Sequence, residues 1–366
     1  MRTIACTTII LLTFAQGCQQ KTPPSPSAEG PTNSLAEAKC LIPKLKSPDF
    51  EAWMAARESL MEIGVNALPA LMDSLDVPYV DQVLVSIGKP AVEPLLKCAE
   101  SDNEEIRWKA VRILGEIGDG RAVLVLIKAL KDDSGFIRRD APDGLGRIGD
   151  QRAFQPLLAL MTNRHETFSE GQPRYSAAKA LEALGGPRLV PAMLAALKDG
   201  RNDTRTRWMS AMVLGNIGAR EDEVVAALVS ALENDVGQVA ACAAEALGQI
   251  GDPRAIKPLL QAFASRRDLR SSIAAGLAHF KKPEVTKALV AALDDKKHQE
   301  SIIAALGDLG DREATMPLVK MLSSPRWEIR FLAARALADL GDPRSAEALA
   351  EHLYDEGDKD VCDASV

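Results

Sequence analysis

The chain has 366 residues, of which 46% are hydrophobic, 26% are charged and only 4% are aromatic. This balance suffices for a folded core, is too polar for a protein with many membrane spans, and favours packed helices over sheets, because strands prefer β-branched and aromatic residues. The formal net charge is −7 and the basic residues are scattered among acids. We therefore expect no nucleic-acid partner, since phosphate binding needs a basic face.

The first 17 residues are predicted to be a signal peptide. Arg2 is followed by an apolar run over residues 3–15, too short to span a bilayer as a helix but of the length of a signal-peptide core. The run ends in Ala-Gln-Gly before Cys18, and small residues before a cysteine resemble the bacterial lipoprotein-type signal. The resemblance implies a lipid on Cys18. A conventional cleavable signal is the alternative.

Residues 18–34 are rich in proline and serine and have almost nothing to bury. Such a composition is typical of an extended tether between a membrane and a folded part. These two segments predict an exported, membrane-anchored lipoprotein that faces the periplasm or the cell exterior. Its contact with the membrane would be the N-terminal lipid only.

From residue 35 to residue 355 one pattern recurs about every 31 residues. Clear copies have a leucine followed, four and five positions later, by Gly-Asp, and they begin at Leu114, Leu145, Leu247, Leu306 and Leu337. Weaker copies begin at Leu60, Leu84, Leu181, Leu214 and Leu277. A fixed period of this size indicates stacked helical units rather than separate domains.

Each unit is predicted to contain two helices. Residues 328–340, an example of the first helix, place their apolar side chains at helical spacing on one wide face. The glycine after it, Gly341, suits a left-handed helix end, and Asp342 suits the N-cap of the second helix. Prolines recur in the first turn of that second helix, as at Pro258, where few backbone donors are needed.

Neither helix of a pair can bury its apolar face alone, so each pair must stack on its neighbours. We predict an all-α protein, an α-solenoid of about ten helix pairs over residues 35–355, followed by an acidic tail over residues 356–366. Such a solenoid presents a long concave surface, which we expect to be formed by parallel second helices.

The repeat sequence is similar to that of a known class. The Leu-Gly-x-Ile-Gly-Asp-x-Arg-Ala turns and the Ile-Arg helix starts, as at Ile106-Arg107 and Ile329-Arg330, resemble HEAT repeats of the phycobilisome-lyase-like class. The resemblance covers roughly residues 40–355 and implies the armadillo-type solenoid fold. It does not fix a function, because the class includes lyases, hydroxylases and binding scaffolds.

Departures from the repeat indicate candidate functional regions. The longest interval contains an enlarged loop over residues 162–174, which is either a tolerated surface insertion or a contact loop for a partner. Its candidate contact residues are Arg164, His165, Glu166, Phe168 and Arg174. A second break places Pro142 and Gly144 inside a first helix, which predicts a kink there.

Trp108 and Trp208 are further candidates for contact with a partner. Each lies six residues before its leucine and directly after an arginine. An exposed Arg–Trp pair can hold a ligand by stacking or cation–π contact. The alternative is that both indoles fill the seam between repeats. The Asp and Arg of the inter-helix turns, as at Asp252 and Arg254, are expected to form caps and a ladder of salt bridges along the stack.

The histidines argue against one enzymatic member of the class. The deoxyhypusine hydroxylase holds two irons with four His-Glu motifs, whereas only His165-Glu166 forms such a dipeptide here. The sequence also has no phosphate-binding glycine loop, no Gly-x-Ser-x-Gly motif and no metal-spaced His/Cys cluster. On these grounds we predict that the chain is not an enzyme and needs neither a cofactor nor a metal.

The predicted function is therefore a non-catalytic scaffold of the bacterial cell envelope that presents its concave surface to a protein or peptide partner. The main alternative is an enzyme or enzyme-associated member of the class, either bilin lyase-like or a hydroxylase-like oxidoreductase. A third possibility is a structural protein of the envelope whose repeats only span a gap.

Overall fold

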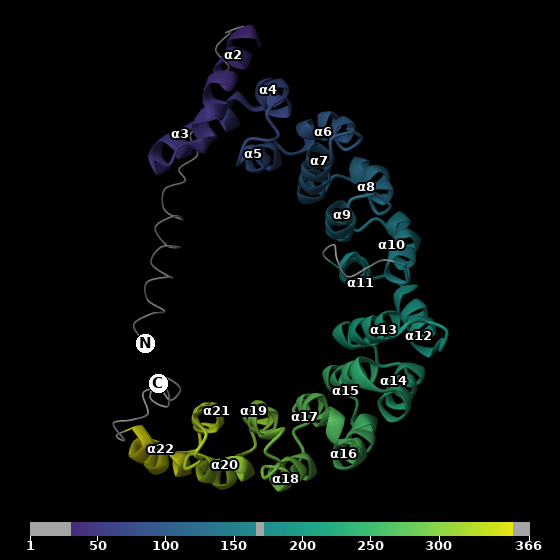
Figure 1. Ribbon diagram of the computed structural model, residues 1–366, viewed down its shortest axis with the longest axis vertical. Coiled ribbons are helices and arrows are strands. Elements are labelled where there is room, and N and C mark those ends of the chain that lie inside the picture. Colours follow the sequence, from purple (N-terminus) through teal and green to yellow (C-terminus); the bar gives the residue numbers. More distant parts are fainter. Residues whose placement is uncertain (1–30, 166–171, 354–366) are drawn as a thin grey trace. The chain divides into compact units, whose positions relative to one another are not determined.

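The computed structural model describes residues 31–165 and 172–353, and over these residues the chain is helical, with no strand (Figure 1). The predicted signal peptide, Cys18, Glu166, Phe168 and the acidic tail lie outside the described residues. Helix α2 (Pro31–Leu41) begins inside the stretch that the sequence assigned to the tether. The predicted all-α solenoid fold is confirmed.

The chain divides into two compact units, residues 1–94 and 95–366. The described helices of the first unit, after α2, are η1 (Ile42–Lys46), α3 (Phe50–Ile63), η2 (Gly64–Ala67), α4 (Leu68–Met72), α5 (Val80–Ile87) and η3 (Lys89–Ala91). Helix α3 packs against α2 and α5 around fully buried leucines such as Leu60 and Leu84. Helix α6 (Val92–Cys98) begins in this unit and ends in the next.

The second unit alternates first and second helices. The first helices are α7 (Glu104–Ile117), α9 (Gly135–Ile148), α11 (Pro173–Leu184), α13 (Thr204–Asn216), α15 (Gly237–Ile250), α17 (Arg270–Leu277), α19 (Gln299–Leu309) and α21 (Trp327–Leu340). The second helices are α8 (Val123–Ala129), α10 (Phe154–Met161), α12 (Leu189–Lys198), α14 (Asp222–Asn234), α16 (Ile256–Ser265), α18 (Pro283–Ala291), α20 (Thr315–Met321) and α22 (Ala346–Leu353). Short 3-10 turns precede five of the second helices and the first helix α17: η4 (Gly120–Ala122), η5 (Gln151–Ala153), η7 (Pro253–Ala255), η8 (Arg267–Leu269, before α17), η9 (Arg312–Ala314) and η10 (Pro343–Ser345).

The predicted turn between the two helices of a pair is confirmed. Gly251 ends α15 in the left-handed region with φ 68°, and the next residue, Asp252, caps the turn η7. The Asp252 carboxylate accepts a hydrogen bond from the Arg254 backbone N–H at 2.9 Å and pairs with the Arg254 guanidinium. The Arg254 guanidinium also reaches Asp222 of α14, 2.6 Å away, so at this turn the ion pairs do connect successive repeats.

Neighbouring first helices approach one another through glycine and alanine. A Cβ atom built at Gly115 of α7 would lie 2.8 Å from the Cα of Gly144 in α9, and one at Gly248 would lie 2.6 Å from the Cα of Gly276. Backbones can come this close only where a side chain is missing. Gly144 therefore serves close packing, and α9 continues as one helix through the buried Pro142.

This packing corrects the expectation for the concave surface. Because the first helices lie closer to one another than the second helices do, the row of pairs in the second unit bends toward the first helices. Figure 1 shows α9, α11, α13 and α15 on the inner side of this row and α10, α12, α14 and α16 on the outer side. The inner surface of this unit is formed by first helices, not by second helices.

Candidate binding face on the first helices

Four successive first helices carry large planar side chains at the same repeat position. This position lies six residues before the leucine of each repeat and holds Trp108 in α7, Arg139 in α9, Tyr175 in α11 and Trp208 in α13. Successive first helices pack against each other, so these side chains follow one another along the row. The rings of Tyr175 and Trp208 have their centroids 6.3 Å apart.

We call these four residues, together with the neighbouring Phe136 of α9, the aromatic strip. Phe136 is 52% exposed and Tyr175 is 38% exposed, whereas both tryptophans are half-buried. The next two first helices carry Ala241 and Ser271 at the equivalent position, so the strip ends at α13. Figure 1 shows three of the helices that carry it, α9, α11 and α13, on the inner side of the row.

The carboxylate of Asp140 fixes the N-terminal end of the strip. It accepts a hydrogen bond from the Trp108 indole N–H at 2.6 Å and one from the Arg139 guanidinium, also at 2.6 Å. The hydrogen bond that Arg139 donates to Asp140 raises the pKa of Arg139, so this side chain stays charged. Arg139 also lies over the Phe136 ring, 5.5 Å from its centroid. A single aspartate thus holds one indole ring and one cation in place, and the cation covers a second ring.

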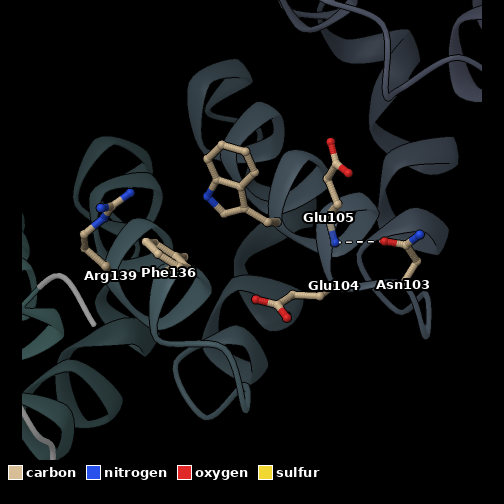
Figure 2. Close-up of a pocket in the computed structure, with 6 residues that line it drawn as sticks. Asn103, Glu104, Glu105, Phe136 and Arg139 are labelled. Carbon is tan, nitrogen blue, oxygen red and sulfur yellow. Dashed lines mark hydrogen bonds between the residues drawn. The ribbon is translucent and has the colours of Figure 1, made fainter. Parts of the chain in front are cut away.

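A hollow of about 560 Å³ opens between α7 and α9 at this end of the strip. We call it the aromatic hollow; it is lined by Asn103, Glu104, Glu105, Trp108, Phe136 and Arg139. Figure 2 shows the Glu104 carboxylate pointing toward Phe136 from α7, while Arg139 lies on the other side of the Phe136 ring. Asn103 caps α7 by accepting a hydrogen bond from the Glu105 N–H at 2.9 Å.

The structure keeps Trp108 and Trp208 as candidate contact residues and gives Arg174 an internal role. Arg174 is only 3% exposed. Its guanidinium donates to the Met161 carbonyl at 2.8 Å, to both carboxylate oxygens of Asp203 at 3.0 and 2.9 Å, and to the Thr206 hydroxyl at 2.6 Å. It therefore closes the base of the enlarged loop and is not available to a partner.

Two residues of the enlarged loop remain at the surface. Arg164 and His165 are exposed, and the His165 backbone N–H donates to the Asn163 side chain at 3.1 Å. Neither residue lines the hollow between α7 and α9.

Sequence reasoning missed Phe136, Arg139 and Tyr175. The signal was present in the column of residues six positions before each leucine, which reads Trp, Arg, Tyr, Trp over the four repeats. It was missed because only the two tryptophans of this column were singled out, and the arginine and the tyrosine at the equivalent position were not compared with them.

The described residues, 31–165 and 172–353, contain neither a group of metal-binding side chains nor a membrane-spanning helix. No three His, Cys, Asp or Glu side chains there are grouped so that they could hold a metal ion. No helix there has both the length and the apolar character required to cross a membrane.

A family model of HEAT repeats matches residues 92–171, 166–241, 201–278 and 286–366. The chain belongs to the HEAT-repeat family. A solved structure of importin beta shares the fold, with a TM-score of 0.52 and 15% identity over 96% of this chain and 55% of that one.

Among curated proteins, the chain is similar to two that are named for bilin chemistry. One is the phycocyanobilin lyase subunit alpha of Picosynechococcus sp., 29% identical over 174 residues, which are 41% of this chain and 65% of the relative. The other is the bilin biosynthesis protein PecE of Mastigocladus laminosus, 33% identical over 100 residues, 26% of this chain. The matches thus span 65% and 37% of these relatives' lengths.

The prediction that the chain is not an enzyme is wrong, because one of these relatives is named a lyase subunit and the other a bilin biosynthesis protein. The prediction rested on missing metal, phosphate-loop and nucleophile motifs. A protein that promotes a reaction by holding two reactants in position needs none of these motifs, because proximity and orientation can be supplied by many residue types.

Proposed function

We propose that this chain is a lyase-type HEAT subunit that binds a partner protein through the aromatic strip. The observation that carries the proposal is the alignment of Trp108, Arg139, Tyr175 and Trp208 on four packed first helices. Tryptophan, tyrosine and arginine are the residues that dominate the binding energy of protein interfaces. Rigid helices hold them, so little side-chain entropy is lost on binding.

Partial burial of the strip supports this use of it. The Trp108 indole is fixed by Asp140, and Tyr175 and Trp208 contact each other, so the rings are already ordered while part of each remains accessible. A preorganised aromatic surface of this kind is typical of the centre of an interface rather than of its rim. The exposed apolar residues of the second helices, such as Leu124 of α8 and Met316 of α20, occur singly.

Site-specific photo-crosslinking in the cells that produce the protein tests partner binding. A photoreactive amino acid replaces Tyr175 in one full-length variant and Leu124 in the other, and both positions are exposed. We expect Tyr175 to capture one discrete partner, and Leu124, on the outer side of the unit, to capture none. Capture of a discrete partner from Leu124, with none captured from Tyr175, would contradict the proposed face.

The lyase-type character is supported by the names of the similar proteins, and it assigns no residue to the reaction. Adding phycocyanobilin to the purified full-length chain tests it. We expect a saturable change in the visible absorption of the bilin near one equivalent. A spectrum unchanged from that of free bilin would refute the lyase-type part and would leave the partner-binding part standing.

We also propose that Cys18 anchors the protein to the bacterial cell envelope by a lipid. Support comes from the apolar run before it and the proline-rich stretch after it. Labelled fatty acid should enter the wild-type protein and should not enter Cys18→Ser. An unlabelled wild-type protein would refute the anchor.

A further inference from the structure

We infer that the aromatic hollow receives a lysine side chain of the bound partner; this inference rests on the proposed function and specifies what one part of the strip recognises. The shape of the hollow is the first reason. Trp108 and Phe136 form apolar walls on two adjacent helices, and Phe136 is more than half exposed. The four methylenes of a lysine can lie along such walls while its ammonium reaches a polar edge.

The charges around the hollow are the second reason. Each cation nearby already has an acidic partner: Arg139 pairs with Asp140 at 2.6 Å, Lys109 with Glu105 at 2.8 Å, and Arg112 with Glu116 at 3.4 Å. Among the described residues, none donates a hydrogen bond or a salt bridge to the Glu104 carboxylate, which points toward Phe136 (Figure 2). The cation that interacts electrostatically with Glu104 is Arg107, and Arg107 is itself paired with Asp132 at 3.0 Å. The Glu104 carboxylate therefore has no ion pair of its own among the described residues.

This arrangement selects a cation over an anion. A carboxylate ligand would meet Glu104, while the guanidinium of Arg139 is held by Asp140 and lies beyond the Phe136 ring. Arg112 lies over the Trp108 ring and Arg139 over the Phe136 ring, each 5.5 Å from the ring centroid, so an ammonium group would be attracted mainly by the Glu104 carboxylate. The net charge of −7 on the whole chain favours the approach of a basic partner as well.

The indole signal of Trp108 provides a direct readout. In full-length protein labelled with ¹⁵N-tryptophan, the four tryptophans give four indole N–H signals, and Trp108→Phe identifies one of them. The probe is the blocked peptide acetyl-Gly-Gly-Lys-Gly-Gly-amide. The control peptide has norleucine in place of lysine, which keeps the apolar stem and removes the ammonium group.

We expect the lysine peptide, and not the norleucine peptide, to shift the Trp108 signal saturably. Glu104→Gln, which keeps the shape of the side chain, should weaken the binding roughly tenfold. Glu284→Gln removes the same charge from α18, outside the hollow, and should leave the binding unchanged.

Three results would overturn the inference: no shift of the Trp108 signal at millimolar peptide, equal shifts by both peptides, or equal binding by Glu104→Gln and wild type. None of these affects the crosslinking from Tyr175, which tests the proposed function separately. If Tyr175 captured no partner while the lysine peptide still shifted the Trp108 signal, the hollow would bind a lysine but the proposed partner face would be refuted.

Discussion

The guanidinium of Arg174 joins α10, α11 and α13 by four hydrogen bonds and is almost fully buried. Burial alone would raise the pKa of Asp203, but the hydrogen bonds from Arg174 and from the Thr206 backbone lower it overall. Arg174→Ala leaves this carboxylate and a buried carbonyl without partners. We expect a loss of about 3 kcal/mol in the free energy of unfolding, measured by urea denaturation.

A matched Arg–Asp pair at the surface serves as the control. Arg201 pairs with Asp199 at 3.0 Å, but the Arg201 side chain is 88% exposed. Surface pairs of this kind contribute little, because water and salt screen them. Arg201→Ala should leave the urea midpoint almost unchanged, and equal losses for the two variants would refute the internal role of Arg174.

The caps of the inter-helix turns make stability depend on pH. Hydrogen bonds from the Arg254 side chain lower the pKa of Asp252 from 3.8 to about 2, against the opposing effect of burial. A carboxyl group with a lower pKa in the folded state stabilises the protein fully above its unfolded pKa, and this contribution is lost as pH falls through the folded pKa.

We therefore expect the wild-type protein to lose stability between about pH 4 and pH 2. The Asp252→Asn variant should be less stable than the wild type at pH 7. Its stability should fall less between pH 4 and pH 2, because it lacks the titrating group. Urea midpoints at several pH values measure the difference. Parallel pH profiles for the two proteins would show that Asp252 does not contribute.

At the scale of the helix, the glycines between first helices control how closely the repeats stack. A methyl group at Gly248 would lie 2.6 Å from the Cα of Gly276, so α15 and α17 would have to separate. We expect Gly248→Ala to reduce the free energy of unfolding by about 2 kcal/mol or more, since added volume in a tight interface forces the backbone to move. Differential scanning calorimetry or urea denaturation checks this.

Gly120→Ala is the control, because it makes the same glycine-to-alanine substitution at a position where a methyl group meets no neighbouring atom. No atom lies within 4 Å of a Cβ built at Gly120, which opens the short turn η4. This variant should be as stable as the wild type or slightly more stable. If Gly248→Ala were equally harmless, the close contact of α15 and α17 would be refuted.

Local chemistry made the helices and turns predictable from the sequence. A glycine with positive φ, an aspartate cap and a proline in the first turn are short-range signals, and they place the turn at Gly251 and Asp252 correctly. The face that lies on the inner side was not predictable in this way. It depends on contacts between repeats, such as Gly115 on Gly144, which are 29 residues apart and have no local signature.

The same reason limits what the sequence says about the candidate site. Trp108 and Trp208 stand out as rare residues, but the hydrogen bond from Trp108 to Asp140 joins different repeats. Arg174 looked like a loop residue because it follows the enlarged loop, whereas its burial depends on Asp203 of the next repeat. Composition and spacing identify such residues without showing which side of the helix they occupy.

At the scale of the whole molecule, we propose that the inner row of first helices is the functional face of the second unit. The strip on α7–α13 gathers the ordered aromatic side chains, whereas Met316 on α20 and Leu124 on α8 are isolated on second helices. A partner that binds the strip must therefore cover Tyr175 and Trp208 and leave those two residues accessible.

Hydroxyl-radical footprinting of the full-length protein, free and in a lysate of the cells that produce it, tests this claim most directly. Tyr175, Trp208 and Met316 all react readily when exposed, so each serves as an internal standard for the others. We predict that the lysate protects Tyr175 and Trp208 and leaves the oxidation of Met316 unchanged. Protection of Met316 and Leu124, with Tyr175 and Trp208 as reactive as in the free protein, would contradict it.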